Sequence, residues 1–159
     1  MRKDRDKELK RCKNYCLRLI SLRPRTEYEL KSRMEEKGYA DEVITGIVGV
    51  LKEEGLVNDL KFAGDWIDSR LRTNPRGVKG LKDELTKKGV SKEVIEEAMS
   101  QREEGLDERA IALELLKDML QGESGQPDNK MKARLYSFLL RRGFDAEVAE
   151  EAVNEALGE

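Results

Sequence analysis

Hydrophobic residues in this chain recur at intervals of three and four positions, a spacing that predicts amphipathic helices. The clearest examples are three pairs of apolar residues, each pair four positions apart, which places both members on one helical face. Several positions after each pair, the pattern is interrupted by a glycine. The pairs are Leu30 and Met34, Leu81 and Leu85, and Leu135 and Leu139.

The interruptions repeat three times with the same residue types. Gly38, Gly89 and Gly143 lie 51 and 54 residues apart. A glycine takes up the left-handed backbone conformation that ends many helices, and the apolar residue after it then packs back onto the last turn. A cation before the glycine suits the negative end of the helix dipole. The flanking residues are Lys37 and Tyr39, Lys88 and Val90, and Arg142 and Phe144.

Another helix is predicted on each side of these glycine-ended helices. Asp41, Ser91 and Asp145 are expected to cap the helices that follow. Of the helices that precede, the first is expected over residues 8–22, after a frayed start, and the other two are capped by Asp59 and Asp107. Three further features mark helix boundaries: the capping box of Thr26 and Glu29, the helix stop at Asn74-Pro75, and the loop at residues 122–127.

These patterns predict nine helices, and no segment alternates as a strand would. The expected fold is therefore all-α, with three tandem three-helix repeats that form an elongated, curved molecule. The expected domain boundaries are 1–58, 59–106 and 107–159.

Composition argues against catalysis. The chain has no histidine and no phosphate-binding loop, and its carboxylate pairs Glu53-Glu54 and Glu103-Glu104 fall at predicted helix ends. Cys12 and Cys16 could share a zinc ion only with two carboxylates, so we expect free thiols, no metal and no cofactor. Without a signal-peptide core or a long apolar run, a cytoplasmic monomer is expected, with no membrane contact.

Charge changes the picture further, because it is sorted by helix although the net charge is only −2. Residues 1–33 carry twelve Lys and Arg against five acids, and residues 70–92 carry eight against two. Residues 93–108 carry seven acids against one base, and residues 145–159 carry six acids and no base. Mutual neutralisation explains part of this sorting, and a basic face for phosphates or an acidic protein surface explains the rest.

The candidate contact residues are the cations of this basic face. The first group surrounds a Pro-Gly turn and consists of Arg70, Arg72, Arg76, Lys79 and Lys82. The second group consists of Arg23, Arg25, Lys87, Lys88, Arg134, Arg141 and Arg142. Trp66 is expected in the core, whereas Tyr15, Tyr28 and Tyr136 either pack or stack on bases.

Three stretches resemble the RecX family of recombinase modulators. They are residues 22–30 (LRPRTEYEL), residues 55–63 (GLVNDLKFA), and Arg70 followed by the glycines and leucines of residues 77–90. The similarity covers nearly the whole chain and is clearest over residues 17–100. Asn58-Asp59 stands where the family often has two acids, and Asn58 is an alternative helix cap.

The resemblance implies three tandem three-helix repeats and binding to the RecA filament on single-stranded DNA. It also implies inhibition of filament extension, ATP hydrolysis and strand exchange, through a basic face that lies in the filament groove. Two alternatives stay open. One is a DNA-binding regulator resembling helix-turn-helix proteins, with weak direct DNA binding, although the last helix of each repeat is acidic. The other is a protein adaptor.

Overall fold

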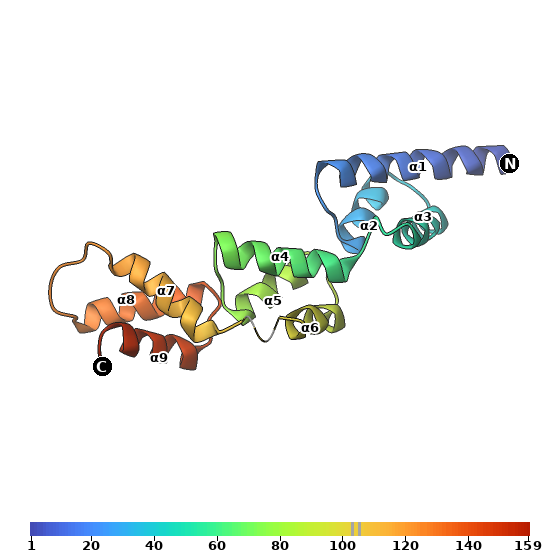
Figure 1. Ribbon diagram of the computed structural model, residues 1–159. Coiled ribbons are helices and arrows are strands. Elements are labelled where there is room, and N and C mark those ends of the chain that lie inside the picture. The colour runs from blue at the N-terminus through green and yellow to red at the C-terminus, as the bar shows by residue number, and fades with distance from the viewer. Residues whose placement is uncertain (103, 105) are drawn as a thin grey trace. The chain divides into compact units, whose positions relative to one another are not determined.

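The computed structural model describes residues 1–102, 104 and 106–159, and within these residues it contains nine α-helices and no strand (Figure 1). Glu103 and Gly105, from the predicted ending of the middle repeat, lie outside the described residues. The prediction of an all-α fold built from three-helix repeats is confirmed. The helices are α1 (Arg2–Leu22), α2 (Glu27–Glu36), α3 (Asp41–Glu53), α4 (Asp59–Thr73), α5 (Val78–Lys87), α6 (Lys92–Ser100), α7 (Glu108–Leu120), α8 (Asn129–Arg141) and α9 (Ala146–Ala156).

The described residues form two compact units. One comprises residues 1–64 and 85–98, and the other comprises residues 65–84 and 99–159. The division passes through the middle repeat, so the predicted domain boundaries at 58 and 106 stay predictions. None of the helices in the described part of the chain is long and apolar enough to cross a lipid bilayer.

The first unit has its main core between α1, α2 and α3. α3 contributes half of its buried residues, because its apolar residues follow the i, i+1, i+4, i+5 pattern of a helix buried along one face. Thr26, at the start of α2, is the one polar residue of the described chain that is fully buried. The core residues are Cys12, Cys16, Leu30, Met34, Val43, Ile44, Ile47, Val48, Leu51 and Val57.

The second unit has its main core between α7, α8 and α9, and α7 packs chiefly on α9. The small residues of α9 allow that close approach, because alanine carries no side chain beyond Cβ. The core residues are Ala112, Leu116, Leu135, Leu139, Phe144, Ala149, Ala152 and Val153.

The three glycine turns form as predicted. Gly38, Gly89 and Gly143 have φ angles of 85°, 83° and 82°. In each turn the amide of the next residue donates to a carbonyl five residues back, at 3.1–3.2 Å, which is the hydrogen bond of a Schellman ending. All three acceptors, Met34, Leu85 and Leu139, are fully buried, so each turn is fixed to the core that it borders.

Several helix starts differ from the prediction. α1 begins at Arg2 rather than near residue 8, because Arg and Lys have high helix propensity and no breaker intervenes. Asp41 is the first residue of α3 rather than its cap. Asn58 caps α4 by accepting from the Lys61 amide at 3.1 Å, so the expectation that Asp59 caps its own helix is wrong. Thr26, Asp107 and Asp145 cap their helices as predicted.

Asp59 instead binds the neighbouring repeat. Its Oδ1 accepts from the Glu27 amide at 3.0 Å, at the start of α2. Glu108 does the same at the start of α5, where its Oε1 accepts from the Val78 amide at 2.6 Å. In both cases a carboxylate from the first helix of one repeat meets the positive N-terminus of the preceding repeat's middle helix, an arrangement that the helix dipole favours.

The glycine turns complete the same two joints. The Thr26 hydroxyl donates to the Lys88 carbonyl at 2.7 Å, and the Gly77 amide donates to the Arg142 carbonyl at 3.0 Å. The start of a middle helix therefore rests on the glycine turn of the following repeat, once in each unit. This recurrence explains how tandem repeats without large cores are stabilised by their neighbours.

Candidate functional site

Four predicted contact residues line one hollow in the first unit. Arg23 and Arg25 come from the link between α1 and α2, whereas Lys87 and Lys88 come from the end of α5. The hollow has a volume of about 290 Å³ and is also lined by Arg33, which the sequence analysis did not select. We call it the cationic hollow; its other lining residues are Tyr28, Glu29, Ser32 and Glu36.

The carboxylates of the cationic hollow offset only part of its charge. Glu29 lies 2.7 Å from Arg23 Nη2 and 3.9 Å from Arg25 Nη1, and Glu36 lies 3.8 Å from Arg33. Five cations against two carboxylates leave three net positive charges in a chain whose total charge is −2. Burial lowers the pKa of the Arg25 guanidinium, whose Nε also donates to the Leu19 carbonyl at 3.3 Å.

Tyr28 forms one side of the cationic hollow. Its side chain is 57 % exposed, yet it rests against Gly89, because a Cβ built on that glycine would lie 2.2 Å from the Tyr28 Cβ. Tyr28 also borders a second hollow of about 680 Å³ that contains Glu27, Lys31 and Lys52. Lys31 and Lys52 both pair with Glu27. Burial raises the pKa of the Glu27 carboxyl, but the two lysines lower it by more, so its pKa is lowered overall.

Two residues of the first predicted group meet at Glu84 in the second unit. Arg70 Nε donates to Glu84 Oε2 at 2.8 Å, and Arg76 Nε lies 2.7 Å from Glu84 Oε1. Trp66 donates to Oε2 at 2.9 Å, and the Arg70 guanidinium lies 4.8 Å from the centre of the Trp66 ring. We call these four residues the Glu84 cluster. Trp66 is half-buried and its indole is hydrogen-bonded to Glu84, so the expectation that it fills the hydrophobic core holds only in part.

Three further predicted residues lie on α8 or directly after it. Arg142 donates to the Asn74 side chain and lies 5.1 Å from the Phe138 ring centre, so it joins the link between α4 and α5 to the last turn of α8. Arg134 pairs with Glu123, and Arg141 is exposed. Contacts within the protein therefore account in part for the presence of cations at Arg142 and Arg134.

Arg72, Lys79 and Lys87 are exposed, and Lys82 is half-buried. Contact with a partner stays a prediction for all twelve residues of the two predicted groups. The acidic α9 is partly neutralised within its own unit, because Glu155 accepts from Arg109 at 2.8 Å. Sequence reasoning missed Arg33 and Glu84. The local signals were a cation one turn after Glu29 and an acid two residues after Lys82.

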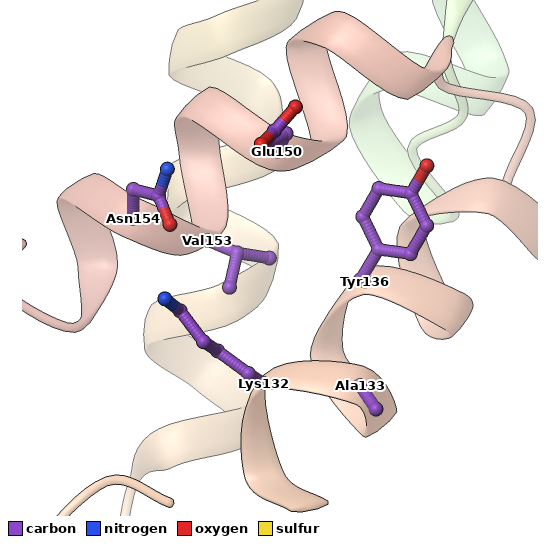
Figure 2. A pocket seen from close by; sticks show the side chains of 6 residues that line it. All are labelled: Lys132, Ala133, Tyr136, Glu150, Val153 and Asn154. Carbon is purple, nitrogen blue, oxygen red and sulfur yellow. The ribbon is translucent and has the colours of Figure 1, made fainter. Parts of the chain in front are cut away.

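A separate hollow of about 370 Å³ lies between α8 and α9 (Figure 2). Lys132 extends from α8 toward α9, where Val153 and Asn154 lie opposite it, and Tyr136 stands one turn further along α8. Lys132 is already paired with Glu159. The single cation among the residues that line this hollow is therefore already engaged within its unit.

The two thiols are poor metal ligands. Burial raises the pKa of the Cys16 thiol to about 12, and burial also raises the pKa of Cys12. Cys12 Sγ lies 3.2 Å from the Met34 sulfur inside the first core. Because zinc binds the thiolate form, these buried, protonated thiols favour packing over metal binding.

Comparison with known proteins agrees with this architecture. Family models of the first, second and third three-helix domains of RecX match residues 12–49, 58–99 and 107–153. A protein of Mycolicibacterium smegmatis named regulatory protein RecX is 38 % identical over 149 residues, covering 91 % of this chain and 79 % of the relative. The regulatory protein RecX of Mycobacterium avium is 36 % identical over 139 residues, and the match covers 87 % of this chain and 80 % of that relative.

Solved structures support the fold. The crystal structure of RecX from Lactobacillus salivarius has a TM-score of 0.83 at 20 % identity, and the match covers 95 % of this chain and 97 % of that one. With all three repeats matched in order and 36–38 % identity to relatives of which the matches cover about four fifths, the chain belongs to the RecX family of regulatory proteins.

Proposed function

We propose that this protein binds the RecA filament on single-stranded DNA in the cytoplasm and limits its extension, ATP hydrolysis and strand exchange. The observation that carries the proposal is the cationic hollow, which gathers residues from two repeats into a surface of net positive charge. Such a surface suits the phosphates of a nucleoprotein filament, and family membership supplies the regulatory role.

The Glu84 cluster supplies a second set of donors. Glu84 contacts both Arg70 and Arg76 through Nε, so the Nη nitrogens of the same guanidinium groups can donate to a phosphate or a carboxylate. Both guanidinium groups are held in place by the shared carboxylate, which lowers the entropy lost when they bind a partner.

The test is single-strand-dependent ATP hydrolysis by the cognate RecA at increasing ratios of this protein. We expect inhibition below one molecule per RecA subunit. A variant of the cationic hollow, with Arg33, Lys87 and Lys88 each changed to Gln, should need about tenfold more protein for equal inhibition, because it loses phosphate contacts. Wild-type protein without effect at any ratio would refute the proposal.

The matched control changes three exposed cations elsewhere, Lys3, Lys117 and Lys130, each to Gln. It alters net charge equally and should inhibit like the wild type. For the first predicted group, Arg72→Gln with Lys79→Gln is preferable to changing Arg70 and Arg76, because both latter residues hold Glu84 and their loss would perturb the fold.

Direct regulation through duplex DNA is the second candidate function. It would give binding to free duplex with an affinity that falls steeply with salt. The acidic α9, which would be the recognition helix of the third repeat, disfavours that reading. An adaptor role would instead leave partner binding unchanged in the variant of the cationic hollow.

A further inference from the structure

Tyr28 is an exposed aromatic residue whose side chain is supported by a neighbouring turn. The residue is 57 % exposed, and the base of its side chain rests on Gly89, where even a methyl group would lie 2.2–2.6 Å from the Tyr28 Cβ, Cγ and Cδ1 atoms. Position 89 also requires a glycine because its φ is 83°, in the left-handed region. The turn after α5 therefore holds an aromatic side chain in place with much of its surface open.

The open side of Tyr28 adjoins the cationic hollow. Lys87 and Arg33 are exposed there, and the Thr26 hydroxyl binds the Lys88 carbonyl, which fixes the turn relative to the start of α2. An aromatic platform and a group of cations thus lie side by side on one unit, positioned by backbone contacts.

We infer that Tyr28 and the cationic hollow form a nucleotide subsite for single-stranded nucleic acid, with a base stacked on Tyr28 and a phosphate held by the cations. The inference rests on the proposed function and assigns to this surface the DNA strand of the filament rather than the protein. Stacking requires a base that is free of its own neighbours, so the subsite favours single strands over duplex.

An acidic peptide would use the cations but not the ring. The exposed, supported aromatic side chain is therefore the observation that favours nucleic acid over a carboxylate-bearing protein segment.

The first measurement is fluorescence anisotropy of a labelled oligo-dT, without RecA and at low salt, against a hairpin duplex of the same length. We expect tighter binding of the single strand. Tyr28→Leu should weaken single-strand binding about tenfold, whereas Tyr28→Phe, which keeps the ring, should bind like the wild type. Lys87→Gln should lower the dependence of log affinity on log salt by about one.

The matched control is Tyr136→Leu, which removes a half-buried tyrosine from the α8–α9 hollow of Figure 2. It should leave single-strand affinity unchanged. Circular dichroism checks that each variant is folded. Photo-crosslinking of the wild type to an oligonucleotide with 5-iodouracil gives an independent readout, since the crosslinked peptide should contain Tyr28.

Equal affinity of Tyr28→Leu and Tyr28→Phe, equal binding of single strand and duplex, or crosslinks only outside residues 22–37 would each overturn the subsite. Because RecA is absent, that failure leaves inhibition of ATP hydrolysis to be judged separately. If inhibition fails while Tyr28→Leu still loses single-strand binding, the subsite stands and the proposed function falls.

Discussion

The three turn glycines have nearly equal φ angles but very different surroundings. A Cβ on Gly38 would meet nothing within 4 Å, one on Gly89 would meet Tyr28, and one on Gly143 would meet the Gly80 Cα at 2.2 Å. Backbone strain is therefore common to all three positions, whereas steric exclusion is confined to the two glycines that form joints.

Alanine substitution at these glycines should separate the two effects. We expect Gly38→Ala to lower the free energy of unfolding by about 1 kcal/mol, through the left-handed backbone alone. Gly89→Ala and Gly143→Ala should lower it by more than about 2 kcal/mol, and Gly143→Ala most, because backbone atoms cannot yield as a side chain can. Urea denaturation measures all three, and equal losses would contradict the joint geometry.

Asp59 gives a prediction about pH. Burial raises its pKa, despite the hydrogen bond from Glu27, so the native state holds its proton more tightly than the unfolded chain. Its contribution to stability therefore falls as pH rises from the unfolded pKa of about 4 through the native value. Asp59→Asn keeps an acceptor for Glu27 and should be more stable than the wild type at pH 7, with the difference shrinking at pH 3.

The contribution of Asp68 to stability is expected to change with pH in the opposite direction. The hydrogen bond from Arg102 lowers its pKa, so its contribution is present at neutral pH and is lost as pH falls. Asp68→Asn should therefore be less stable than the wild type at pH 7 and equal to it in acid. Thermal melts of both variants across pH 3–7 test the pair, and shifts of the same sign would contradict this account.

At the scale of elements, Glu84 joins the end of α4, the link after it and α5. Removing its charge leaves two half-buried guanidinium groups without their shared carboxylate. We expect Glu84→Gln to lower the free energy of unfolding by about 1–2 kcal/mol. It should also shift the fluorescence of Trp66, the chain's single tryptophan, whose indole binds the same carboxylate.

The control for Glu84→Gln is Asp83→Asn, an exposed neighbour on the same helix. It should change stability by less than about 0.5 kcal/mol and leave Trp66 emission unchanged. Equal fluorescence shifts in the two variants would mean that Glu84 is not specific in holding Trp66 and the arginines.

At the scale of the whole molecule, each unit contains one joint between repeats, so damage to a joint should be local. We expect Gly143→Ala to speed amide hydrogen exchange in α7, α8 and α9, while α1, α2 and α3 keep their protection. Hydrogen exchange followed by mass spectrometry tests this, with Gly89→Ala, at the joint of the first unit, as the reciprocal case. Uniform loss of protection in both variants would indicate a single cooperative unit.

The start of α8 differs from the starts of the other two middle helices. α8 begins earlier relative to its glycine than α2 and α5 do relative to theirs. Its first amides therefore lie elsewhere, and Asp128 of the preceding loop already caps them through the Met131 amide. The monomer itself stays a prediction, as does the elongated, curved shape.

Much of this protein was determined by its sequence alone, because the deciding interactions are local. The spacing of Leu30 and Met34 and its two equivalents specified helices, and glycines followed by apolar residues specified how these helices end. Caps such as Thr26 and Asp145 bond to amides three residues away, so neighbours in the chain sufficed to predict them.

Tertiary structure decided which distant residues meet. Asp59 resembles a cap of its own helix, yet it binds Glu27 because the preceding repeat brings that amide within 3.0 Å of its carboxylate. Glu84 captures Arg70 and Arg76 only once the helices of the middle repeat pack. The cationic hollow unites residues 23–33 with 87–88 only once the first two repeats meet. Periodicity sets which face of a helix is polar, but long-range packing sets what that face contacts.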